Sequence, residues 1–324
     1  MAFQPPSKSL TPRDYQFIVL VAVAIIIVST ALIFANLAIE GGGGDFFVHW
    51  VGGRSFMFDG IEPYSGEVAT RTQSLVYGSP AKAGDEPFIL DTPFHILLLY
   101  FPFSLFSSPM LARAVFTSVL ELALVGIPVL GLRLLERKMP RAIDILIIIL
   151  GALNFYSIQA IYSANPVLLL GLIYVGILLS LRAGTDEITG ALIAISLYYW
   201  EVGAPFLFLV VFRVYEEKRT RVLAGFVMLS FILLAISFLL YPNWIIPFLR
   251  ASVNNWRAEF GYNIHSIFSH FWPDQGSAFA WMIIVGLVFL LGREWSAVRG
   301  ADYARFYWAS GLTLVATPLL GFRT

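Results

Sequence analysis

The stretch GGGGDFFVHW, residues 41–50, follows the first long apolar segment of the chain, Phe17 to Ala38. That segment is long enough for a helix to span a bilayer. The glycines end the helix, and Asp45 stands directly after them. An ionisable side chain at a membrane boundary is a functional candidate by default. Residues 46–59 mix apolar and polar side chains, which predicts an amphipathic run along the membrane surface.

Composition indicates a membrane protein. Hydrophobic residues make up 58% of the 324 positions and charged residues only 13%, and the mean hydropathy is +0.77. This is too apolar for a soluble domain of such length, so the sequence predicts a polytopic all-α bundle. The formal net charge of zero averages over segments of opposite sign and says nothing about nucleic acid, but no basic patch appears, so we expect no nucleic-acid partner. The absence of cysteine excludes disulfides and thiolate metal sites.

Charge places the first two segments relative to the membrane. Lys8 and Arg13, against Asp14, put the N-terminus in the cytoplasm by the positive-inside rule. No small-residue cleavage site follows the first apolar segment, so we interpret it as an anchor that exits outward. Residues 39–91 hold eight acidic residues and three basic ones. We therefore expect them to form an exoplasmic loop.

The next apolar segment, Thr92–Phe106, is short and contains Pro93 and Pro102. Both features favour a surface or re-entrant helix over a full span. If this segment does not cross, the basic residues at 133–141 lie in the cytoplasm, as the positive-inside rule requires.

The remaining apolar segments predict alternating spans, at Met110–Leu132, Ile143–Ile161, Pro166–Leu181, Ile188–Trp200, Val202–Phe212, Val222–Tyr241, Phe279–Leu291 and Tyr307–Leu320. A break at residues 200–205 keeps the basic loop 213–221 inside. With the anchor, this makes about nine spans in a single integral membrane domain, residues 1–324. Its two large exoplasmic loops, 39–109 and 242–277, are expected to hold amphipathic surface helices.

Polar residues converge on the outer face of this topology. They are Asp45, the segments 91–95 and 154–165, Glu201, the Asn- and His-rich loop 242–277, and Arg323. A hydrophilic, lipid-linked substrate would meet this set.

Several motifs in order resemble those of one family. They are a Gly-Asp after the first span, Gly60-Ile61-Glu62-Pro63-Tyr64, Thr92-Pro93-Phe94 leading to Phe101-Pro102-Phe103, Gln159 with Ala164-Asn165-Pro166 before a Leu-rich span, and Tyr262-Asn263-Ile264-His265-Ser266 in the late loop. Together they resemble glycosyltransferase family 87, a branch of the GT-C superfamily related to polyprenyl-phosphate-mannose-dependent mannosyltransferases.

The resemblance implies a GT-C membrane fold in the cell membrane with an exoplasmic active site. It implies a hexose, mannose in the related enzymes, transferred from a polyprenyl-phosphate sugar to a lipid or glycan acceptor. Transfer would invert the anomeric centre without metal or other cofactor, and the aspartate after the first span, here Asp45, would be the general base.

The chemistry of the transfer also indicates which residues would bind the leaving phosphate and the sugar. The departing polyprenyl phosphate gathers negative charge and needs fixed donors. Arg257, His265, Asn263 and Arg323 are the outer-face candidates, Asn165 stands in the turn that resembles the family's, and Tyr64 could stack on a sugar. Since the leaving group is already a phosphate, no general acid is required.

Other interpretations stay open. Asp45 could be a solvated helix end or pair with Arg54, and Glu201 could be paired inside the bundle. Relatives often carry Lys near Trp200-Glu201, and they continue with further spans after a segment like Thr317-Pro318-Leu319-Leu320. The alternative is therefore a non-catalytic membrane subunit that retains the fold and binds a protein partner.

Overall fold

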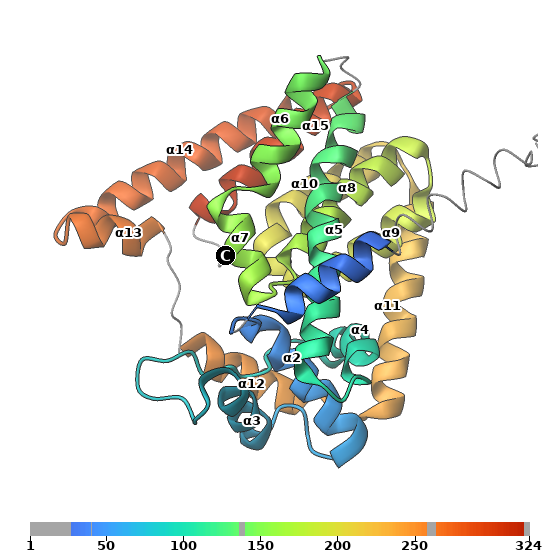
Figure 1. Cartoon of the computed structure of the whole chain (residues 1–324). Helices are drawn as coiled ribbons and strands as arrows, with labels where there is room; N and C mark the ends of the chain where they lie inside the picture. The colour runs from blue at the N-terminus through green and yellow to red at the C-terminus, as the bar shows by residue number, and fades with distance from the viewer. Residues whose placement is uncertain (1–26, 40, 136–139, 258–263, 321–324) are drawn as a thin grey trace, which may run out of the picture.

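The computed structural model describes residues 27–39, 41–135, 140–257 and 264–320, without the side chains of residues 201, 255–257 and 266. Within these ranges the chain is helical and contains no strand (Figure 1). Most of the expected anchor, Phe17–Ala38, lies outside the described residues. Its described part is a helix over Ile27–Leu37.

The later elements follow in chain order, with α for α-helices and η for π- or 3-10 helices. They are α2 (Gly44–Arg54), η1 (Ser55–Asp59), α3 (Gly66–Tyr77), α4 (Phe94–Ser104), α5 (Pro109–Leu135), α6 (Arg141–Ala152), α7 (Phe155–Ser163), α8 (Val167–Ala183), α9 (Asp186–Ser196), η2 (Leu197–Tyr199), α10 (Trp200–Glu216), α11 (Thr220–Leu240), α12 (Ile245–Arg257), α13 (Ile264–Phe271), α14 (Gly276–Ser296), α15 (Tyr303–Ala316) and η3 (Pro318–Leu320).

Three helices, α5, α11 and α14, are long and apolar enough to cross a membrane. The pair α6 and α7 would make a fourth span if it is counted as one bent unit. The expectation of about nine spans is not confirmed, because α8, α9, α10 and α15 have only 17, 11, 17 and 14 residues. A helix perpendicular to a bilayer needs roughly 20.

The predicted span Ile143–Ile161 is broken. Its two halves, α6 and α7, meet at an angle of 48°. Asn154 causes the break, because its side-chain oxygen accepts a hydrogen bond from the Ser157 backbone N–H at 3.0 Å and so starts a new helix.

The break predicted at residues 200–205 is wrong in position. The chain bends earlier, in the short 3-10 turn η2, and α10 begins at Trp200 and continues through Pro205. Pro205 lies in the second turn of α10, where a proline removes a single helical hydrogen bond. The short helix expected in Thr92–Phe106 is confirmed as α4.

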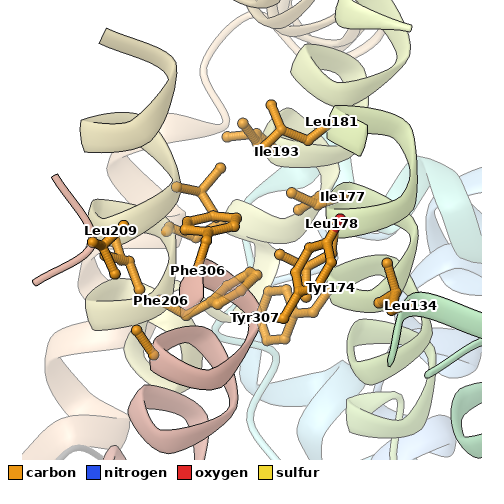
Figure 2. Close-up of a cluster of buried hydrophobic side chains, with 14 of the residues drawn as sticks. Leu134, Tyr174, Ile177, Leu178, Leu181, Ile193, Phe206, Leu209, Phe306 and Tyr307 are labelled. Carbon is orange, nitrogen blue, oxygen red and sulfur yellow. The ribbon is translucent and has the colours of Figure 1, made fainter. Parts of the chain in front are cut away.

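The helices pack around two main apolar cores. One joins α8, α9, α10 and α15, with Tyr174, Ile177, Phe206 and Phe306 at its centre (Figure 2). The second joins α2, α4 and α5. Figure 1 shows α2, α3, α4 and α12 grouped around the start of α5 and the end of α11. We call these four helices the cap layer.

Helices α9 and α11 approach each other closely at two glycines. A Cβ added to Gly190 would lie 1.9 Å from the Val222 carbonyl oxygen, and one added to Gly225 would lie 2.2 Å from that of Glu187. Small residues are what let helix backbones pack at such short range. This pair therefore fixes the side of the bundle on which α11 lies.

We expect Gly190→Ala to destabilise the protein by about 1–3 kcal/mol, because the added methyl group must push two backbones apart. Thermal unfolding of the purified protein in detergent measures the loss. The matched control is Gly286→Ala on α14, where nothing lies within 4 Å of the new Cβ. Equal melting temperatures for the two variants would contradict the close approach.

Candidate functional site

Asp45 is the second residue of α2, and that helix is buried instead of lying on the surface. Phe46 and Phe47 are 0% and 1% exposed, and His49 is 4% exposed. The amphipathic surface run expected over residues 46–59 is therefore wrong for α2, around which α3, α4 and α5 pack, whereas residues 57–59 after it are exposed. Asp45 itself stays partly exposed at the helix start.

The glycine run brings this helix start against the end of α7. The Gly43 N–H donates to the Tyr162 carbonyl oxygen at 2.8 Å, with Gly43 at a φ of 82°. A Cβ on Gly42 would lie 2.3 Å from the same carbonyl oxygen. Glycine is needed at both positions, because the backbone is left-handed and leaves no room for a side chain.

Arg113, on the candidate span α5, holds the other side of the run. Its guanidinium donates to the carbonyl oxygens of Gly41 and Ile39, and to that of Asn36 at 3.2 Å. The Asn36 side chain in turn donates to Glu121 at 3.0 Å. Our sequence analysis missed this network, although charged residues within an apolar helix were the available signal.

The Asp45 carboxylate accepts hydrogen bonds from the side chains of Ser163 and Asn165. Asn165 is well placed to donate, because its own side-chain oxygen accepts from the Val167 N–H at 2.9 Å. Burial raises the pKa of Asp45, and the two hydrogen bonds offset part of that rise. The structure thus brings Asp45 and Asn165, both named from the sequence, into one site.

A buried polar chain lies directly behind Asp45. The His49 Nδ1 lies 2.9 Å from the Asp45 carbonyl oxygen, and its Nε2 lies 3.0 Å from the Tyr198 hydroxyl. That hydroxyl is 3.1 Å from the hydroxyl of Tyr100, whose ring stacks on His49 at 4.3 Å. Burial lowers the pKa of His49 to about 4, so its ring is neutral at physiological pH. The chain links α2 to α4 and to the turn η2.

Tyr64 lies elsewhere in the cap layer. Its hydroxyl donates to the Thr92 carbonyl oxygen at 2.9 Å, and burial raises its pKa. Its ring lines a pocket of about 520 Å³ between α3 and α12, together with Glu62, Gln73, Arg250 and Asn254. Asp45 does not line this pocket.

His265 is not brought to Asp45. It lies on α13, where its Nδ1 is 3.4 Å from the Ser277 hydroxyl and its ring is 5.1 Å from that of Trp281. Helix α13 packs on α14 and η3, well away from α2 (Figure 1). Asn263 and Arg323, and the side chains of Arg257 and Glu201, lie outside the described residues.

Arg54 does not pair with Asp45. Its Nη1 donates to the carbonyl oxygens of Ser104 and Phe106, both at 3.3 Å. It lines a second pocket, of about 290 Å³, which Asp45 does not line either. The alternative of an Asp45–Arg54 ion pair is therefore wrong.

Comparison of the chain with family models, curated proteins and solved structures finds no match. The chemistry of the site thus rests on its own geometry. A partly exposed carboxylate with a raised pKa, fixed by two side-chain donors, is suited to accept a proton from a bound hydroxyl group.

The neutral state of His49 makes stability depend on pH. Its folded pKa, about 4, lies below its ordinary value of 6.5, so the unfolded chain binds more protons between these values. Stability from His49 is therefore complete above pH 6.5 and is lost as the pH falls toward 4. Asp45, with its raised pKa, contributes with the opposite sign.

We expect the free energy of unfolding to fall by about 2 kcal/mol between pH 7.5 and pH 5 through His49. Chemical unfolding at both pH values measures this difference. In His49→Gln, which does not titrate, the difference should shrink, although the variant is less stable at pH 7.5. An unchanged pH difference in the variant would show that His49 is not buried in its neutral form.

Proposed function

We propose that the protein is a membrane glycosyltransferase of the GT-C type. It transfers a hexose, with mannose as the first candidate, from a polyprenyl-phosphate donor to a lipid or glycan acceptor, with inversion and without metal. Asp45 is the general base. The observation that supports this most is the Asp45 carboxylate held by Ser163 and Asn165 at the edge of the glycine run.

The reaction needs one proton acceptor. The acceptor hydroxyl oxygen attacks the anomeric carbon while Asp45 takes its proton, and the bond from that carbon to the phosphate oxygen breaks. The electron pair leaves with the polyprenyl phosphate, which is stable as an anion. A positioned carboxylate contributes about 10²–10⁴-fold to such a step.

The environment of Asp45 suits this role. Burial raises its pKa and makes the carboxylate a stronger base, while the hydrogen bonds from Ser163 and Asn165 fix its orientation. The glycines before it pack against Tyr162, Arg113 and Phe88, and this close packing fixes the position of Asp45. Two residues that the family resemblance singled out, far apart in the sequence, share this contact.

Donors for the leaving phosphate are less well supported. Arg257, Asn263 and Arg323 stay proposed contacts. His265 lies on α13, away from α2, and contributes nothing to the proposal in this conformation. Tyr64 stays a proposed stacking contact for a sugar, although Asp45 does not line its pocket.

A non-catalytic membrane subunit is the second candidate. It is favoured by the fact that neither of the two pockets described above is lined by Asp45. Such a subunit would keep the helices and bind a partner chain on its apolar surface. The two candidates differ in a single property, the dependence of transfer on the Asp45 carboxylate.

We expect Asp45→Asn to lower hexose transfer from a polyprenyl-phosphate sugar by at least about 10²-fold, because the amide cannot accept the proton. Membranes carrying the variant, with radiolabelled donor, provide the assay. Asp274→Asn removes an exposed carboxylate beyond α13 and should leave the rate unchanged. Equal rates for Asp45→Asn and the wild type would exclude the base role and favour the subunit.

We expect Ser163→Ala and Asn165→Ala to move the acid limb of the pH–rate profile to higher pH. Each variant removes a hydrogen bond that lowers the pKa of Asp45, so deprotonation then needs a higher pH. The profile of kcat/KM against pH measures the shift. Acid limbs that stay in place, or move to lower pH, would disconnect these side chains from the base.

A further inference from the structure

A second polar site lies at the far end of α2. The pocket of about 290 Å³ is bounded by Trp50, Arg54, Asp59, Arg71, Leu75 and Pro109. It lies where the last turn of α2 passes into the π-helical turn η1 and faces α3 and the start of α5. Single π-helical turns are rare and are often found at functional sites.

The guanidinium of Arg54 is held in place but is only partly used. Its two hydrogen bonds within the described residues, to the Ser104 and Phe106 carbonyl oxygens, both come from Nη1. Its Nε and Nη2 have no partner among the described residues. Its charge lies 4.9 Å from the Phe58 ring and 5.7 Å from the Trp50 ring. An Nε–Nη2 edge is the face of arginine that binds phosphate in a bidentate way.

The other cation that lines the pocket, Arg71, is paired with two carboxylates, of which Asp59 lines the pocket and Glu67 does not. Arg71 forms ion pairs with Asp59 and, at 2.9 Å, with Glu67. No carboxylate pairs with Arg54 within the part of the chain that the structure describes. Of the two arginines that line the pocket, Arg54 is therefore the one whose charge has no carboxylate partner among the described residues.

The position of the pocket indicates that a phosphate bound there belongs to a lipid headgroup. Pro109 is the first residue of α5, a helix long and apolar enough to span a membrane. The end of such a helix lies at the level of the lipid headgroups. Large apolar side chains are exposed nearby on the neighbouring turns: Phe58 is 56% exposed, Leu105 62% and Met110 40%. Acyl chains would cover these side chains.

A purely structural role explains only part of this arrangement. A cation in the last turn of α2 is favourable because the helix dipole is negative there, and the two carbonyl oxygens fix the side chain. Neither effect accounts for an open donor edge beside a pocket and exposed apolar rings.

We propose that this pocket binds the phosphate of an anionic phospholipid, with Arg54 as its bidentate donor and Phe58 and Leu105 against the acyl chains. The site is separate from Asp45 and holds whether or not the protein transfers a sugar. It would anchor the cap layer to one leaflet of the bilayer.

Native mass spectrometry of the detergent-purified protein tests the site, with phosphatidylglycerol as the probe and phosphatidylcholine of the same chains for comparison. We expect Arg54→Gln to weaken phosphatidylglycerol binding about tenfold or more, since a charge-assisted contact to phosphate is lost. Arg54→Lys should fall between the two. Lys82→Gln, which removes an exposed cation in the loop after α3 that lines neither pocket, is the control and should bind like the wild type.

A second variant keeps the test valid if Arg54→Gln unfolds. Phe58→Glu places a carboxylate on an exposed ring position and should weaken phosphatidylglycerol binding without a loss of melting temperature. Inorganic phosphate should not displace the lipid, and displacement would overturn a lipid as the source of the phosphate. Equal phosphatidylglycerol binding by the wild type, Arg54→Gln and Phe58→Glu would overturn the site itself.

Discussion

The site around Asp45 depends on one buried arginine. Arg113 is 4% exposed on the apolar helix α5 and donates to three carbonyl oxygens where the helix Ile27–Leu37 ends. The last carbonyl groups of a helix have no partner within it, and in an apolar setting that deficit is costly. Arg113 satisfies one of them, that of Asn36, together with the Ile39 and Gly41 carbonyl groups beyond the helix end, and so fixes the glycine run against α5. The glycine run is hydrogen-bonded to the end of α7, and this contact brings Asp45 next to Ser163 and Asn165.

Burial of α2 follows from the same anchoring. With its start held by the glycine run, α2 lies among α3, α4 and α5, and its aromatic side chains form much of their common core. The polar chain from His49 through Tyr198 to Tyr100 crosses this core and satisfies groups that would otherwise be unpaired. Asp45 and Arg54 stand at opposite ends of one rigid helix. The proposed base and the proposed ligand of a lipid phosphate are thus kept apart by the length of α2.

Much of the helical content could be predicted from the sequence, since apolar length alone indicates α5, α11 and α14. The predicted breaks were less accurate. Asn154 ends a helix by capping the next one, which is a side-chain contact within four residues and was open to prediction. Pro205 was expected to break a helix and lies inside α10 instead, where it removes one backbone hydrogen bond of the second turn. Of the site residues proposed from the sequence, the structure brings Asp45 and Asn165 together, whereas His265 lies on α13, away from α2.

The sequence by itself determined the class of protein, the helices long enough to span a bilayer, and the carboxylate that follows the glycines, because these depend on composition and local order. Only the tertiary structure decided that α2 is buried and that Arg113 holds it. It also decided that α13 lies with α14, away from Asp45. The reason is that an apolar run with scattered polar residues fits a membrane surface or a protein core equally well. Whether such a run lies on the membrane surface or in the protein core depends on residues far away in the sequence that hydrogen-bond its backbone and polar groups.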